Sequence, residues 1–241
     1  GAGCIRDGII TETTGTALVM AAYTTSPCFE HPSRVTIYRH ALQGSYLYLP
    51  IGNTAGMFLK WFRQNFCQEI PLTEPKAYAL LDNMAESIPA GCNGLITLPY
   101  LAGCVNPDNN SSAKGVFFGA DLGTTKAHFV RSIMEAVCFM MRDFINMLSE
   151  LGVKPEVIYS LGGGSRSELW EQMKADVCGI PFTTMKCNEA ASTGAALLAG
   201  WGSGLLPKNF YPEIEYRKKY IPNRELEKIY HDVYQKFTDL Y

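Results

Sequence analysis

The chain has 241 residues, of which 47% are hydrophobic and 18% are charged, and its formal net charge is −2. This length and apolar content are enough to bury a sizeable core, so one large globular domain is the first expectation. The nearly neutral balance gives no electrostatic footprint for nucleic acid and no attraction to an anionic membrane, which leaves small molecules as the expected partners.

The cysteines and the amino-terminal segment indicate where the protein works. Eight cysteines are scattered along the chain without a CxxC pair or a histidine at metal-ligand spacing, so no metal site is predicted. Neither a signal-peptide pattern nor a stretch of roughly 20 apolar residues is present, and we expect a reducing cytoplasm. Because the first residues, 1–8, lack a methionine, we expect a piece of a longer protein.

The first third of the chain predicts strands followed by helices. A buried strand is expected over residues 16–23, after a turn formed by Thr13-Thr14-Gly15, and shorter strands over 35–38 and 46–49 would complete an antiparallel meander. The sequence then changes to helical periodicity. Helices are expected over 55–66 and over 74–87, the second capped by Thr73, and a strand is expected over 93–100.

The remainder alternates between helix and strand. The strongest helix pattern covers 126–148, where Arg131 and Glu135 lie four residues apart on what reads as the polar side. The elements expected after it are a strand over 157–161, a glycine loop, a helix over 167–177, a strand over 181–185, a helix over 189–200 and a terminal amphipathic helix from Tyr216 onward. This alternation favours an α/β domain.

Two glycine-containing segments could bind a ligand. Thr13-Thr14-Gly15-Thr16 would offer backbone amides and hydroxyls to a polyphosphate, although such turns are more often hairpin connectors. Leu161 to Ser167 contains three successive glycines between a strand and a helix, which would let a flat ring or ribose approach the backbone. This segment is neither a Walker A loop nor a GxGxxG fingerprint, and a plain strand-to-helix turn is its alternative interpretation.

A third segment, Asn188 to Ala196, is better explained by structure than by chemistry. Asn188 can cap a helix, and its small face at Ala191, Gly194 and Ala195 would allow close packing against the sheet. Glu189 in the first turn is favoured by the helix dipole and needs no catalytic role. The four histidines lie near no nucleophile motif, and none receives a role.

Taken in order, these segments resemble the C-terminal domain of the FGGY carbohydrate kinases. The resemblance covers nearly the whole chain and is carried by six ordered blocks: 1–8, 14–16, Leu98 to Gly103, Lys114 to Gly119, Gly162 to Trp170 and Glu189 to Ala196. It implies an actin-like, ribonuclease-H-like ATPase fold with a mixed sheet flanked by helices. It also implies that residues 1–241 form the nucleotide-binding domain, without the N-terminal domain that would hold most of the sugar.

The resemblance also implies roles for particular residues. Gly15 and Thr16 match the phosphate-contacting turn, and Gly56 with Lys60 falls where the family touches ribose and phosphate. The adenosine loop matches Gly163, Gly164 and Ser167. Lys60 and Ser167 depart from the residues frequent in relatives, and the segment 103–107 departs more clearly.

The implied reaction is transfer of a phosphoryl group from ATP, with Mg²⁺, to a sugar hydroxyl, and xylulose is the expected acceptor. The general base of the family would be an Asp upstream of Gly1, so no catalytic residue is expected in the chain, which alone should phosphorylate nothing. Glycerol, ribulose or gluconate are alternative acceptors, and a non-catalytic actin-like ATP-binding module is an alternative from another class. A homodimer is a further expectation.

Overall fold

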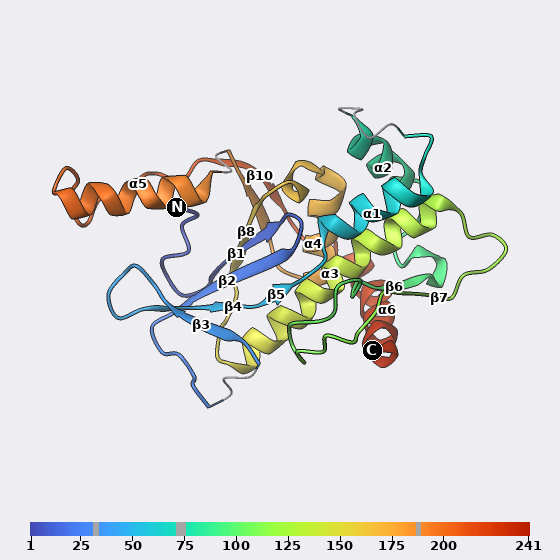
Figure 1. Cartoon of the computed structure of the whole chain (residues 1–241), viewed down its shortest axis with the longest axis horizontal. Coiled ribbons are helices and arrows are strands. Elements are labelled where there is room, and N and C mark those ends of the chain that lie inside the picture. Colours follow the sequence, from blue (N-terminus) through green and yellow to red (C-terminus); the bar gives the residue numbers. More distant parts are fainter. Residues whose placement is uncertain (31–33, 71–75, 187–188) are drawn as a thin grey trace.

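The computed structural model describes residues 1–30, 34–70, 76–186 and 189–241 and is built around an eight-stranded mixed sheet (Figure 1). The strand order is β10-β9-β8-β1-β2-β4-β3, with β5 paired to β2. The strands are β1 (Ile9–Thr14), β2 (Leu18–Thr24), β3 (Thr36–Arg39), β4 (Tyr46–Leu49), β5 (Ile51–Gly52), β8 (Val157–Leu161), β9 (Phe182–Met185) and β10 (Tyr216–Tyr220). A small second sheet joins β6 (Ile96–Leu98) to β7 (Val116–Phe118).

The helices are α1 (Gly56–Phe66), α2 (Ala77–Glu86), α3 (Lys126–Glu150), α4 (Glu168–Cys178), α5 (Ala190–Ser203) and α6 (Glu227–Leu240). The expected α/β class, a mixed sheet flanked by helices, is therefore confirmed. Within the described part of the chain, no helix is long and apolar enough to cross a bilayer. The seven cysteines that the structure describes are free thiols.

The main core lies between one face of the sheet and the long helix α3. Met134, Val137 and Met141 of α3 are fully buried, and α3 also packs against α1, α2, α4 and α6. A much smaller apolar cluster, made of Ile9, Tyr159, Leu161 and Met185, covers the opposite face. Alternate residues of β1 consequently belong to different environments, because successive side chains of a strand point to opposite faces.

The parallel pairing of β1 with β8 positions the rest of the molecule. Glu12 lies opposite Ser160, and Thr13 lies opposite Leu161. Since parallel strands end at the same edge of a sheet, the turn after β1 and the glycine loop after β8 lie next to each other.

Several predicted boundaries in the first half need correction. Thr13 and Thr14 are the last residues of β1, and the turn consists of Gly15, Thr16 and Ala17. The expected meander is wrong in its order, because β4 lies between β2 and β3. The expected strand at 93–100 is limited to β6 and follows a 3₁₀ turn at Cys92–Gly94. Helix α2 begins at Ala77, and the predicted cap Thr73 lies outside the described residues.

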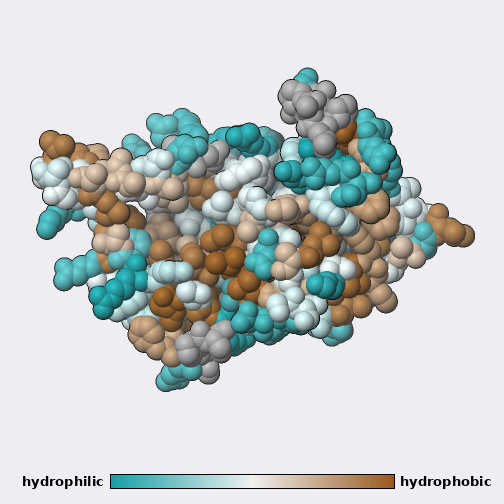
Figure 2. Space-filling model, in the orientation of Figure 1, coloured by the Kyte–Doolittle hydropathy of each residue, from teal (hydrophilic) through white to brown (hydrophobic). Residues whose placement is uncertain are grey.

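The carboxyl-terminal region differs more. The segment from Tyr216 begins as β10, paired with β9, and the terminal helix starts only at Glu227. The prediction was wrong here because tyrosines and lysines are compatible with an exposed edge strand as well as with the wet face of a helix. Helix α5 does not lie along the sheet: its first residue, Ala190, packs against the small apolar cluster, but none of its residues is buried, and it projects from the body beside the N-terminus (Figure 1). Figure 2 shows pale and brown, mostly non-polar residues along it. Asn188 lies outside the described residues.

The ion pair of α3 is not on a polar side. Arg131 Nε lies 2.8 Å from Glu135 Oε1, and their side chains are 8% and 1% exposed. Arg131 also donates to the Ala85 carbonyl and the Tyr230 hydroxyl, so α3 is polar here toward α2 and α6 rather than toward water. Spacing of four residues predicts that two charges meet, but it does not say whether another helix covers them.

Replacing Arg131 with methionine is expected to lower the free energy of unfolding by about 3–5 kcal/mol, because a buried Glu135 carboxylate would lose its partner. The exposed pair Arg6–Glu156 is the matched control, and Arg6→Met should leave the free energy of unfolding almost unchanged. Urea unfolding of both variants measures the difference. Equal losses would contradict the buried placement of Arg131.

Candidate functional site

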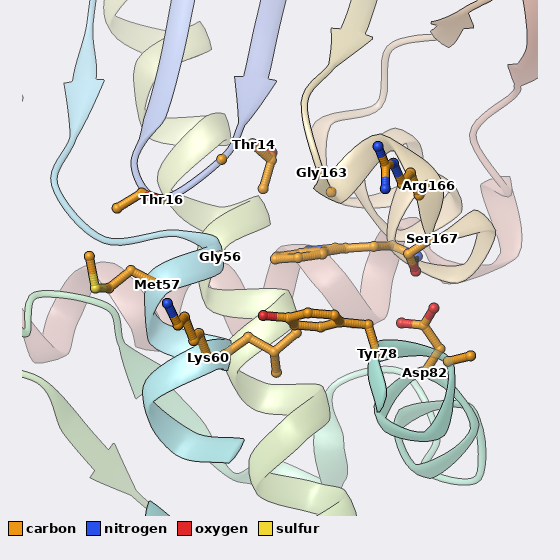
Figure 3. A pocket seen from close by; sticks show the side chains of 15 residues that line it. Thr14, Thr16, Gly56, Met57, Lys60, Tyr78, Asp82, Gly163, Arg166 and Ser167 are labelled. Atoms are coloured by element: carbon orange, nitrogen blue, oxygen red, sulfur yellow. Dashed lines mark hydrogen bonds between the residues drawn. The ribbon is translucent and has the colours of Figure 1, made fainter. Parts of the chain in front are cut away.

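A cavity of about 460 Å³ opens at the shared edge of β1 and β8, between these strands and helices α1, α2 and α4 (Figure 3). It is lined by Thr14, Gly15, Thr16, Gly56, Met57, Leu59, Lys60, Tyr78, Ala79, Asp82, Gly163, Gly164, Arg166, Ser167 and Trp170. All seven residues predicted to touch a nucleotide are in this set. The structure therefore brings them together in one pocket, while their contacts with a nucleotide remain a prediction.

The turn after β1 is docked on the first turn of α1. The Gly15 carbonyl accepts a hydrogen bond from the Gly56 amide at 2.9 Å, and the Thr16 carbonyl accepts from the Met57 amide at 3.2 Å. The Gly15 amide donates to the Ala17 carbonyl at 3.0 Å. Among the described residues nothing engages the Thr16 amide or hydroxyl, so these two groups of the turn are available to a ligand.

Gly56 is required by this docking. A Cβ atom at this position would lie 2.5 Å from the Gly15 carbonyl oxygen, closer than backbone atoms can tolerate. Glycine at position 56 is therefore needed for the packing of α1 on the turn, whether or not Gly56 also contacts ribose and phosphate as predicted.

The three glycines after β8 differ in what they face. Gly162 has φ +83° and its Cβ position lies 2.8 Å from the Thr14 carbonyl oxygen, while that of Gly164 lies 2.7 Å from the Thr14 side chain. Gly163 has φ −64°, which any residue adopts, and nothing lies within 4 Å of its Cβ position. Gly162 and Gly164 thus serve the contact with Thr14, and Gly163 leaves open space at the wall of the cavity.

The start of α4 forms another wall. The Ser167 hydroxyl accepts a hydrogen bond from the Trp170 amide at 3.1 Å, as an N-cap does. Trp170 is 3% exposed, and its indole N–H donates to the Met134 carbonyl, which fixes the ring. Burial raises the pKa of Asp82, and a hydrogen bond with Ser167 opposes that shift.

Charges are few in the pocket. Lys60 and Arg166 supply its two cations, and Asp82 is the one carboxylate among the described residues that line it. Figure 3 shows Lys60 on the side of Thr16 and Gly56, and Arg166, Ser167 and Asp82 on the opposite side. An anionic group is therefore favoured between Thr16 and Lys60.

Sequence reasoning missed Tyr78 and Asp82, which come from α2. They are four residues apart and so share one face of that helix, but the pattern could not say which element this face meets. Leu59 and Met57 were also missed, because apolar residues of a helix read as core.

Comparison with known proteins decides the family. The model of the C-terminal domain of the FGGY family of carbohydrate kinases matches residues 11–203. The chain belongs to the FGGY family of carbohydrate kinases.

Individual FGGY relatives agree with this assignment. The xylulose kinase of Bacillus subtilis is 28% identical over 253 residues, which are 100% of this chain and 49% of that protein. The autoinducer-2 kinase of Yersinia pestis (strain Pestoides F) is 28% identical over 95% of this chain and 45% of its own length. The chain thus spans about half the length of the curated relatives it matches.

A solved FGGY structure confirms the fold. The crystal structure of the xylulose kinase from Rhodospirillum rubrum superimposes with a TM-score of 0.88 at 27% identity, covering 100% of this chain and 48% of that one. The actin-like ATPase fold implied by the sequence resemblance is therefore confirmed.

Gly163→Val is expected to weaken ATP binding at least about tenfold, because the new side chain enters the open space of the cavity without straining the backbone. Gly202→Val on α5 is the matched control, since nothing lies within 4 Å of its Cβ position either. Isothermal titration with ATP measures both variants. Unchanged ATP affinity in Gly163→Val would contradict the assignment of this cavity as the nucleotide site.

Proposed function

We propose that this chain is the nucleotide-binding half of an ATP-dependent carbohydrate kinase whose acceptor is a ketopentose such as xylulose. The observation that carries the proposal is the assembly of seven predicted residues, from three separate segments of an FGGY-family chain, around one cavity. The match to xylulose kinases over the whole chain favours xylulose as the acceptor.

The two sides of the pocket suit the two ends of an ATP molecule. Gly163, Gly164 and the fixed Trp170 ring offer the flat, partly apolar wall that a nucleobase and ribose need. The Thr16 amide and hydroxyl and the Lys60 ammonium offer hydrogen bonds and positive charge, which a polyphosphate needs. In this arrangement the terminal phosphate lies toward Thr16 and Lys60, away from Asp82.

Proton transfer requires a group that this pocket does not provide. Asp82 lies on the wall opposite Lys60 and is tied to Ser167, so it is poorly placed to accept the proton of a sugar hydroxyl attacking the terminal phosphate. We propose that the general base, an Asp, and most of the sugar contacts come from outside residues 1–241. Closure of that part over the cavity would exclude water from the reaction.

The fit for Mg²⁺ is incomplete in the part of the chain that the structure describes. Among the described residues there is no group of three or more His, Cys, Asp or Glu side chains that could hold a metal ion. Mg²⁺ accompanying the nucleotide would have to be held by phosphate oxygens and by residues outside this chain.

Other acceptors are alternatives within the same reaction class. The similarity to an autoinducer-2 kinase at 28% identity equals that to a xylulose kinase, so identity alone does not choose between the two acceptors. A non-catalytic ATP-binding module would share the pocket but transfer no phosphoryl group.

The intact enzyme that contains this chain is expected to phosphorylate xylulose with a higher kcat/KM than glycerol, ribulose, gluconate or autoinducer-2. Lys60→Gln should raise the KM for ATP about tenfold or more, since a hydrogen bond to a charged group is worth about 1.5–3 kcal/mol. Lys154→Gln, an exposed lysine that does not line the pocket, is the matched control. A coupled ADP-release assay over this panel gives both results.

The outcomes separate the alternatives. A different preferred acceptor would change the substrate but keep the reaction class. ATP binding by the intact enzyme without phosphorylation of any acceptor in the panel would favour the non-catalytic module. An unchanged KM for ATP in Lys60→Gln would indicate that the phosphates do not bind on the Lys60 side of the pocket.

A further inference from the structure

A cluster of charged side chains lies beneath the pocket, fully enclosed by protein. Lys174 Nζ lies 2.7 Å from Glu12 Oε1 and 2.5 Å from Glu171 Oε1, and all three side chains are 0% exposed. The Ser160 hydroxyl lies within hydrogen-bonding distance of both carboxylates and is 2.8 Å from Glu171 Oε1. We call Glu12, Ser160, Glu171 and Lys174 the charge cluster.

The charge cluster joins three walls of the pocket from below. Glu12 belongs to β1 and stands two residues before Thr14, whereas Ser160 lies opposite it in β8, two residues before Gly162. Glu171 and Lys174 belong to α4, whose first residues form the Ser167 and Trp170 wall. Each member therefore lies within four residues, along the sequence, of a residue that lines the cavity.

Thr14 connects the charge cluster to the pocket. Its hydroxyl donates to Glu12 Oε2 at 2.8 Å, so the oxygen is directed inward. Its Cβ and methyl group lie 2.7 Å from the position that a Cβ of Gly164 would occupy. Because Thr is branched at Cβ, one χ1 angle sets both the inward hydroxyl and the contact with the glycine loop.

Stability alone does not account for such a cluster. Burying one ammonium and two carboxylates carries a large desolvation cost, and apolar residues of similar volume hold a core as well or better. Glu171 Oε2 has no hydrogen-bond partner among the described residues, which adds to that cost. What charged groups provide that apolar groups do not is direction, since each hydrogen bond fixes the orientation of two side chains.

We propose that Glu12, Glu171 and Lys174 are positioning residues of the nucleotide site. Through Thr14 they hold the turn after β1 at a fixed distance from the Gly162–Gly164 loop, so that the phosphate side and the base side of the pocket engage one nucleotide together. This inference rests on the proposed nucleotide site. None of the three residues touches the ligand in it.

The test compares ATP affinity with stability in three variants of the protein. The first replaces the cluster with apolar residues (Glu12→Leu, Ser160→Ala, Glu171→Leu and Lys174→Met together), which also removes the buried Ser160 hydroxyl, and is expected to retain the free energy of unfolding. The second, Thr14→Val, keeps the shape of Thr14 and removes its hydroxyl. The third, Arg131→Met, breaks a pair that is also buried but contacts Ala85 and Tyr230 instead of the pocket.

Isothermal titration with ATP should show at least about tenfold weaker binding in the apolar variant and about fivefold weaker binding in Thr14→Val. Arg131→Met should bind within about twofold of the unmodified protein, despite its lower stability. Urea unfolding of every variant supplies the stability scale.

Two results would overturn the positioning role: a stable apolar variant that binds ATP like the unmodified protein, or affinity losses that follow stability across all three variants. If the apolar variant does not fold, the comparison of Thr14→Val with Arg131→Met decides, and equal affinities reject the role. Failure of the unmodified protein to bind ATP would instead reject the nucleotide site itself, and this inference with it.

Discussion

The parallel pairing of β1 with β8 is the constraint on which the pocket depends. Two segments almost 150 residues apart in the chain become neighbours through it, as the Glu12–Ser160 register shows. Two further walls are attached to this pair: α1 is docked on the turn after β1, and α4 follows the loop after β8. A slip of one residue in the register would turn Glu12 away from Lys174 and Thr14 away from Gly164.

Much of this arrangement could be predicted from local patterns. The apolar stripe of α3 predicted that this helix lies in the core, and the glycines after β8 predicted the loop at the pocket. Both predictions succeeded because each pattern is formed by residues close in sequence. The family resemblance added the pairing of the two loops, which no local pattern contains. Alternation alone could not separate the edge strand β10 from the helix that follows it.

What escaped prediction depends on contacts between distant elements. Arg131 and Glu135 read as a surface pair, and Lys174 and Glu12 did not read as a pair at all, since the partners of the second pair are 162 residues apart. Tyr78 and Asp82 enter the pocket only because α2 packs beside α4. Burial by another helix leaves no mark on the sequence of the helix that it covers.

The docking of the turn on α1 has a mechanical consequence. Because the Gly15 and Thr16 carbonyls are tied to the first amides of α1, the turn and this helix form one body, and the glycine loop with α4 forms another. The nucleotide proposed for this pocket would contact both bodies at once, with β1 and β8 as their shared base. Because the two bodies meet where Thr14 contacts the Gly162–Gly164 loop, a change at this contact would alter the width of the pocket more than the shape of either wall.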